Sequence, residues 1–292
     1  MSYIDDFKNY RENQKISPNT IAMEVRYLTK FHTFLNILHK RKVPVWEITF
    51  KDVAHFFDEE SKHLSDRTLY RKITIISLYY DYLWNHNHIT IDFMTKFRQK
   101  YRNLLDWDIP EIKVDYQVML DRKEEIIQST EIHLMPKLIY LLLLRGVTLA
   151  DMIKIEIDDI VLHSNTAHII YETSKDKLER NLIYDTPVEV ELIREGIALA
   201  GSRGVPFLLS TKSKTDKQYT MFNPVNLHDM VKPIESILEF PVSSTNKVLY
   251  AYVHFLATIQ KKSVEEMSRL LGMTKPHTAK ILKTTLERIN KI

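Results

Sequence analysis

Apolar residues recur at three- and four-residue spacing through the N-terminal third of the chain, which is typical of helices with one buried face. The first run follows Ser17-Pro18, a pair suited to a helix N-cap and the first helical position. A second run follows Ser65, and residues 49–59 predict a shorter helix between the two. The expected buried stripes contain Ile21, Val25, Leu28, Phe31, Leu35 and Leu38 in the first helix and Leu69, Ile73, Ile76, Tyr80 and Leu83 in the second.

The helical pattern breaks near residue 105. Residues 92–105 predict one more helix, and Pro110 follows soon after it. Proline disfavours the helical conformation in the residue before it, so we expect a linker over residues 106–116. The chain of 292 residues is also longer than a typical single domain. We therefore expect two domains, residues 1–108 and residues 117–292.

The rest of the chain mixes helical and strand patterns. Residues 166–171 and 181–184 are rich in β-branched and aromatic side chains and predict a hairpin with a polar loop over residues 172–177. A basic loop is expected over residues 211–217. Further helices are predicted over residues 121–129, 136–144 and 188–200. The predicted fold class is mainly α with a small β-hairpin or sheet.

Composition narrows the function classes. The 5 glycines argue against glycine-rich nucleotide loops, and the absence of cysteine excludes disulfides, thiolate metal sites and cysteine nucleophiles. The 12 histidines show no HExxH or comparable metal spacing, so we expect neither a metal nor a cofactor. Apolar runs are too short for a membrane span and the N-terminus lacks a basic-then-apolar signal, which predicts a cytoplasmic protein without membrane contact.

The net charge of +3 comes entirely from residues 1–110. The remainder of the chain is balanced, so any surface for a polyanion must come from clustered cations rather than from bulk charge.

The most specific motif lies in residues 256–282. Its Leu270-Leu271-Gly272 resembles the LLG near the end of tyrosine recombinase (phage integrase) catalytic domains, upstream of the nucleophilic tyrosine. Residues 141–160 resemble the family segment LLLxTGxRxSEL, and the N-terminal helices resemble its core-binding domain more loosely. The resemblance implies a two-domain architecture, in which a helical core-binding domain precedes an α+β domain of the catalytic type.

The resemblance also locates the family's catalytic positions, and this chain departs from the family at each of them. In the order arginine, histidine, arginine, histidine or tryptophan, and tyrosine, the residues found here are Thr148, Lys247, Tyr250, Met273 and Leu282. No tyrosine follows Tyr252 in the sequence. Without a nucleophile no covalent phosphotyrosine intermediate forms. The resemblance therefore implies a recombinase frame that has lost strand transfer, and we expect no enzyme activity.

Duplex DNA is the partner that the resemblance implies, held as in a clamp by both domains. The family delivers a lysine to DNA from a hairpin, and Lys175 or Lys177 takes that position here. The cations expected to contact DNA are Arg26, Lys30, Arg67, Arg71, Lys72, Lys175, Lys177, Lys212, Lys214, Lys247, Lys275 and Lys280.

Residues 263–282 also support a second interpretation. They resemble a helix-turn-helix with Gly272 in the turn and residues 275–280 opening the recognition helix. The alternative for this segment is an ordinary helical hairpin.

A protein that binds DNA in this way without cutting it is predicted to be a transcriptional repressor. The most specific form of this hypothesis is a regulator that maintains prophage lysogeny in the cytoplasm of a bacterial host, associated with the nucleoid. Such a regulator would self-associate on DNA and answer to a small regulatory protein or peptide. Two alternatives stay open: a divergent active recombinase that uses His277 or is completed in trans, and an accessory architectural protein for integration or excision.

Overall fold

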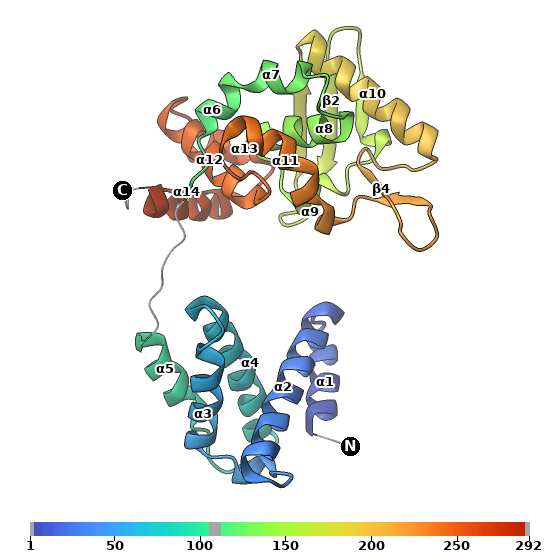
Figure 1. The fold of residues 1–292 in the computed structure, drawn as a ribbon. Coiled ribbons are helices and arrows are strands. Elements are labelled where there is room, and N and C mark those ends of the chain that lie inside the picture. Colours follow the sequence, from blue (N-terminus) through green and yellow to red (C-terminus); the bar gives the residue numbers. More distant parts are fainter. Residues whose placement is uncertain (1–2, 105–111, 290–292) are drawn as a thin grey trace. The chain divides into compact units, whose positions relative to one another are not determined.

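The computed structural model describes residues 3–104 and 112–289, and the chain divides into two compact units, Met1–Asp108 and Ile109–Ile292. Each unit has its own hydrophobic core. Figure 1 shows the elements of each unit.

In residues 3–104 of the first unit, the regular elements are all helices. Its elements are α1 (Tyr3–Asn13), α2 (Pro18–His39), the short 3-10 helix η1 (Val45–Glu47), α3 (Phe50–Ser61), α4 (Asp66–Asn85) and α5 (Met94–Leu104). Ser17 caps α2 by accepting the Thr20 N–H, and Thr49 forms a capping box with Asp52 at the start of α3. The three helices predicted between residues 17 and 85 are confirmed, and a core rich in Phe and Tyr rings lies between them.

Three details of this unit differ from the prediction. Helix α1 was not expected, because Phe7 is its one buried residue and no apolar stripe repeats along it. Leu38 is 43% exposed rather than buried, because the buried stripe of α2 ends at Leu35 and the last turn faces solvent. Helix α5 begins at Met94, because the Asp92 side chain accepts the Met94 N–H and fixes the start there.

The second unit is mainly helical with two small antiparallel sheets. Its helices are α6 (Tyr116–Asp121), α7 (Lys123–Gln128), α8 (Leu134–Leu144), α9 (Leu149–Met152), α10 (Pro187–Arg203), α11 (Leu227–Leu238), α12 (Thr245–Thr258), α13 (Val264–Leu271) and α14 (Lys275–Ile289), with the 3-10 helices η2 (Ile157–Asp159) and η3 (Pro224–Asn226). The strands are β1 (Ile160–Leu162), β2 (Ala167–Glu172), β3 (Glu179–Tyr184), β4 (Ser210–Lys212) and β5 (Tyr219–Met221).

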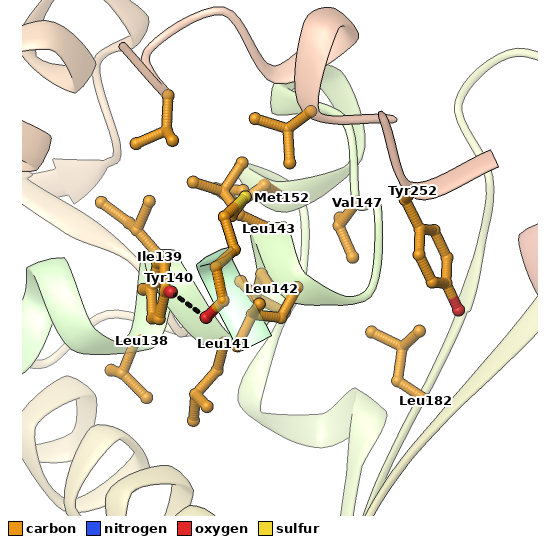
Figure 2. Close-up of a cluster of buried hydrophobic side chains, with 14 of the residues drawn as sticks. Leu138, Ile139, Tyr140, Leu141, Leu142, Leu143, Val147, Met152, Leu182 and Tyr252 are labelled. Atoms are coloured by element: carbon orange, nitrogen blue, oxygen red, sulfur yellow. Dashed lines mark hydrogen bonds between the residues drawn. The ribbon is translucent and has the colours of Figure 1, made fainter. Parts of the chain in front are cut away.

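Helix α8 is the centre of this unit. Nearly every side chain from Met135 to Leu144 is buried, so the helix is apolar on all sides and other elements surround it. Figure 2 shows Leu138, Leu142 and Leu143 packed among neighbours that include Leu182 of β3 and Tyr252 of α12. Two tyrosines also fasten the helix: Tyr140 Oη donates to the Met119 carbonyl at 2.6 Å, and Tyr116 Oη donates to the Leu144 carbonyl.

The hairpin predicted from β-branched content is confirmed as β2 and β3, which pair from Ala167 opposite Tyr184 to Glu172 opposite Glu179. Strand β1 was not predicted, and it adds a third strand on the other side of β2. The helix predicted over residues 121–129 is confirmed as α7, which begins at Lys123 because the chain leaves the helical conformation at Arg122. Helix α6, before Arg122, was not predicted.

The expected basic loop over residues 211–217 is wrong in part. Thr211 and Lys212 belong to β4, and the remaining residues form the turn before β5. The fold class, mainly α with small antiparallel sheets, is confirmed.

Candidate functional site

A pocket of about 780 Å³ opens in the second unit at the tip of the β2–β3 hairpin. Its walls come from the start of α9, hairpin residues 173–176, segment 243–246, helix α12 and the start of α14. We call it the hairpin pocket. It brings together parts of the chain that are more than a hundred residues apart, such as Thr148 and His277.

Three of the five positions assigned by resemblance line this pocket, namely Thr148, Tyr250 and Met273. Lys175 lines it too. Lys247 and Leu282 are not among the lining residues. Leu282 lies instead on an apolar groove between α13 and α14, with Val264 and Leu286.

Thr148 serves as the N-cap of α9. Its Oγ1 accepts a hydrogen bond from the Asp151 N–H and donates one to Asp151 Oδ2 at 2.9 Å. The hydroxyl is therefore used both as donor and as acceptor within the protein. The other oxygen, Asp151 Oδ1, accepts the Ser174 N–H at 2.6 Å, and Ser174 Oγ donates to the Ala150 carbonyl. The start of α9 therefore holds one side of the hairpin tip.

A chain of three polar side chains holds the other side of the tip. Asp176 Oδ2 lies 2.6 Å from His277 Nδ1 and also accepts the Thr274 N–H, and His277 Nε2 lies 2.8 Å from Lys175 Nζ. When the Lys175 ammonium donates to Nε2, the imidazole proton is on Nδ1 and is donated to Asp176. Burial alone would raise the pKa of Asp176, but the hydrogen bonds from His277 and Thr274 outweigh it and hold the pKa below its usual range.

Arg180 of β3 lies beneath this arrangement and is only 2% exposed. Its guanidinium donates to the carbonyls of Leu270 and Arg145 and to the hydroxyl of Tyr171. Both carbonyls come from the C-terminal ends of helices, α13 and α8, where the helix dipole is negative. The charge is therefore balanced by backbone dipoles, and Arg180 ties β3 to the ends of both helices.

Among the residues that the structure describes, no arginine lines the pocket. Arg145, close to Thr148 in sequence, turns away: it donates to the Ile183 carbonyl and stacks on the Tyr184 ring. Arg288 of α14 lies with its guanidinium carbon 4.9 Å from the centre of the Tyr250 ring, outside the lining. Lys175 and His277 are the basic side chains in the pocket, and they are bonded to each other.

The candidate cations of the first unit fall into two groups. Lys30 and Lys72 share one buried carboxylate, Glu60, at 2.5 and 2.8 Å. Burial raises the pKa of Glu60, but the two lysines outweigh burial and hold the pKa below its usual range. Arg26, Arg67 and Arg71 are exposed, and none of them forms an ion pair within 4 Å in the part of the chain that the structure describes.

The candidate cations of the second unit are spread over several elements. Lys177 pairs with Glu172 at 3.4 Å and Lys275 pairs with Glu265 at 3.1 Å. Lys212 lies beside the Tyr219 ring. Exposed or half-buried positions without an ion pair within 4 Å among the described residues are Lys214, Lys247 and Lys280.

Helices α13 and α14 have the outline of the predicted helix-turn-helix. Gly272 ends α13 in the left-handed conformation at φ 59°, and Lys275 opens α14. The first turn of α14 is held against the hairpin by His277, while Lys275, Lys280 and Lys283 face solvent. A helical hairpin packed into the domain describes this segment, and its outer face carries lysines.

No group of side chains suited to hold a metal ion occurs in residues 3–104 or 112–289. Across the same residues, the helices are too short or too polar to cross a membrane.

Sequence reasoning missed Asp151, Asp176 and Arg180 as determinants of the site. Thr148 and Asp151 do fit the S/T-x-x-D/E capping pattern, which would have identified Thr148 as a helix cap. Nothing in the local sequence pairs Asp176 with His277 or Arg180 with helix ends, because these partners are far away along the chain.

The chain is similar in sequence to known proteins. Residues 4–87 match the family model for the phage integrase N-terminal SAM-like domain. Tyrosine recombinase XerD of Rickettsia bellii (strain RML369-C) is 25% identical over 202 residues, which span 66% of this chain and 64% of the relative, so the match covers less than two thirds of that protein.

Solved structures show the fold. A lambda integrase (75–356) dimer bound to a COC′ core site aligns over 96% of this chain and 93% of its own, with a TM-score of 0.68 and 11% identity. The XerH site-specific recombinase bound to palindromic difH substrate aligns over 94% and 79%, with a TM-score of 0.63 and 13% identity. Together the matches show that residues 4–87 are similar to the phage integrase N-terminal SAM-like domain, and that the fold of the chain is that of lambda integrase and XerH.

The hydrogen bonds of Arg180 give a first prediction. Arg180→Met keeps much of the volume but leaves the Arg145 and Leu270 carbonyls and the Tyr171 hydroxyl without their donor. Each unsatisfied buried group costs about 1–3 kcal/mol, so we expect the free energy of unfolding in urea to fall by about 3 kcal/mol or more. Arg269→Met, at an exposed position of α13, is the control and should change it by less than about 0.5 kcal/mol. Equal effects of the two substitutions would contradict the role given to Arg180.

Proposed function

We propose that this protein binds duplex DNA sequence-specifically without transferring strands, and that it acts as a transcriptional repressor that maintains prophage lysogeny. One observation carries the proposal: the hairpin pocket, in a unit with the recombinase fold, has no arginine among its described lining residues, and the basic side chains that line it, Lys175 and His277, are bonded to each other. Strand transfer needs a nucleophile and preorganised donors for the charge that develops on the phosphate. Thr148, Met273 and Leu282 supply neither.

The hydrogen bonds of the pocket's polar side chains support the absence of strand transfer. Lys175 is one of the two candidates for the family's hairpin lysine, yet its ammonium is directed to His277, and His277 is directed to Asp176. Thr148 is committed to capping α9. A phosphate entering the pocket would have to replace these bonds, whereas a catalytic site holds its donors ready for the substrate.

DNA binding is supported by the fold and by exposed cations. The lambda integrase and XerH structures are complexes with DNA, and we extend that partner to this chain. Arg26, Arg67 and Arg71 project into solvent from α2 and α4 without an ion-pair partner within 4 Å among the described residues. Phosphate neutralisation by such side chains dominates the affinity of proteins for duplex DNA. In this proposal both units contact the duplex, and copies of the protein associate on it.

A repressor role follows from binding without cutting. A protein that occupies a promoter and leaves the DNA intact blocks transcription, and the proposed role is similar to that of the recombinase-like master repressor of SP-beta-type Bacillus prophages. The protein would then work in the cytoplasm of a bacterial host, on the nucleoid, and a small regulatory protein or peptide would release it.

One specific observation favours a second candidate, a divergent recombinase. His277 lines the pocket and is oriented by the Asp176 carboxylate, an arrangement that activates imidazoles in other enzymes. Against it, the Nε2 atom that would attack a phosphate already faces the Lys175 ammonium. An accessory role in integration or excision is a third candidate and differs from the repressor in where it binds.

Incubation with a suicide substrate separates the first two candidates. The substrate is a nicked duplex carrying a sequence that the protein has selected from a random library, and the readout is a covalent adduct on a denaturing gel. We expect the protein to bind the duplex and shift all of it on a native gel. We expect no covalent adduct on the denaturing gel. An adduct that disappears in His277→Gln or Tyr250→Phe would establish a recombinase and refute the repressor.

The two groups of cations on the first unit give a further prediction. Each neutralised phosphate contributes about 0.9 to the negative slope of log K against log salt. Arg67→Gln and Arg71→Gln should each lower that slope by roughly one on a mixed-sequence duplex. Lys72→Gln should lower it by less, because Glu60 already balances that lysine.

Lys232→Gln on α11 is the matched control, since Lys232 pairs with Asp229 on its own helix. The slope of log K against log salt for Lys232→Gln should equal that of the unmodified protein. Unchanged slopes for both Arg67→Gln and Arg71→Gln would place the DNA on another surface.

A further inference from the structure

A second pocket, of about 400 Å³, lies wholly within the first unit. Helices α1, α2 and α4 and the segment of residues 42–46 form its walls. We call it the aromatic pocket, and its side chains used below are Tyr3, His32, Asn36, Lys42, Trp46 and Tyr79. It shares no residue with the hairpin pocket and none with the candidate DNA-contacting cations.

Two buried polar atoms of this pocket lack a hydrogen bond. Tyr79 is completely shielded from solvent, and neither its hydroxyl nor His32 Nε2 has a partner among the described residues. Leaving such a group unsatisfied destabilises the fold, and native proteins rarely tolerate it without a reason. The Tyr27 and Tyr80 hydroxyls also lack a partner in the part of the chain that the structure describes, but these residues do not line the aromatic pocket. Tyr79 and His32 line the same cavity, and this shared position points to a bound molecule as their missing partner.

The protonation states of the two groups limit the chemistry of that molecule. Burial lowers the pKa of His32 to about 4, so the imidazole is neutral at physiological pH. Burial also raises the pKa of Tyr79 well above its usual range, so its hydroxyl keeps the proton and can donate. The molecule must therefore offer an acceptor to Tyr79 and an uncharged polar atom to His32.

The walls indicate a flat, ring-bearing molecule. The His32 and Tyr79 rings meet edge to face at 5.7 Å, and the Tyr3 and Trp46 rings meet edge to face at 6.5 Å. Trp46 is 61% exposed, which leaves a large aromatic side chain in solvent beside the cavity. Aromatic side chains in such arrangements favour a planar ligand that can stack on one ring and meet the edge of another.

We propose that the aromatic pocket binds a small planar heteroaromatic molecule with a ring acceptor, hydrogen-bonded at depth by Tyr79 and His32. A volume of about 400 Å³ is within the usual range for small-molecule sites. The proposal goes beyond DNA binding and does not depend on it, because every wall of the pocket belongs to the first unit.

The test uses the full-length protein without DNA and three probes, adenine, quinoline and indole. Adenine and quinoline carry a ring acceptor, whereas indole has a donor only. Calorimetry and saturation-transfer NMR should show adenine or quinoline binding with a dissociation constant of about 1 mM or tighter. Indole should bind more weakly than either, because it cannot accept from Tyr79.

Tyr79→Phe tests the hydrogen bond and Tyr80→Phe is its matched control. Tyr80 is equally buried, its hydroxyl also lacks a partner, and it does not line the pocket. Removing an unbonded hydroxyl should leave both variants at least as stable to heat as the unmodified protein. Tyr79→Phe should weaken acceptor binding by about threefold to tenfold, and Tyr80→Phe should not change it.

Two results would overturn the proposal. One is the absence of binding by all three probes up to their solubility limits, which would leave water as the occupant. The other is equal binding in Tyr79→Phe and the unmodified protein, which would show that any bound probe does not use the pocket's buried hydroxyl.

Discussion

The buried guanidinium of Arg180 is the constraint on which the second unit's site depends. It joins β3 to the carbonyl ends of α8 and α13, and those carbonyls supply the negative end of two helix dipoles in place of a carboxylate. The same packing explains Gly272: a Cβ there would lie 2.8 Å from Arg180 Cβ, and its φ of 59° suits glycine. Gly146 is fixed in the same way, by its φ of 66° and by the Tyr252 ring. The glycines that carry the family resemblance are thus required by packing, whatever chemistry the pocket performs.

Around that frame, the side chains of Thr148, Asp151, Lys175 and Asp176 in the hairpin pocket are hydrogen-bonded within the protein. Asp151 joins α9 to the hairpin tip, and Asp176 joins the tip to α14 through His277. These bonds hold the hairpin loop in one place without any substrate. Polar groups that are hydrogen-bonded within the protein stabilise its structure. In a catalytic site, by contrast, the donors are free to bind the substrate phosphate. The proposal of a recombinase fold that binds DNA without strand transfer rests on this contrast.

The sequence predicts the parts of this structure that repeat locally. The stripes from Ile21 to Leu35 and from Leu69 to Leu83 identify α2 and α4, and β-branched content identifies the β2–β3 hairpin. It does not predict α1, where one buried residue makes no pattern. Nor does it show that Lys30 and Lys72 share Glu60, or that Lys175 meets His277 102 residues away, because side chains brought together by tertiary packing leave no local signature. Candidate cations chosen from sequence are therefore of unequal value, and the exposed arginines of α2 and α4 are the strongest.

Genome-wide mapping of the protein's binding sites by chromatin immunoprecipitation in host cells tests the central claim most directly. A repressor that uses a recombinase fold to hold DNA should occupy a limited set of discrete sites that overlap promoters, with transcription from those promoters rising when the protein is depleted. Occupancy confined to attachment sites, with no change in transcription on depletion, would contradict the account.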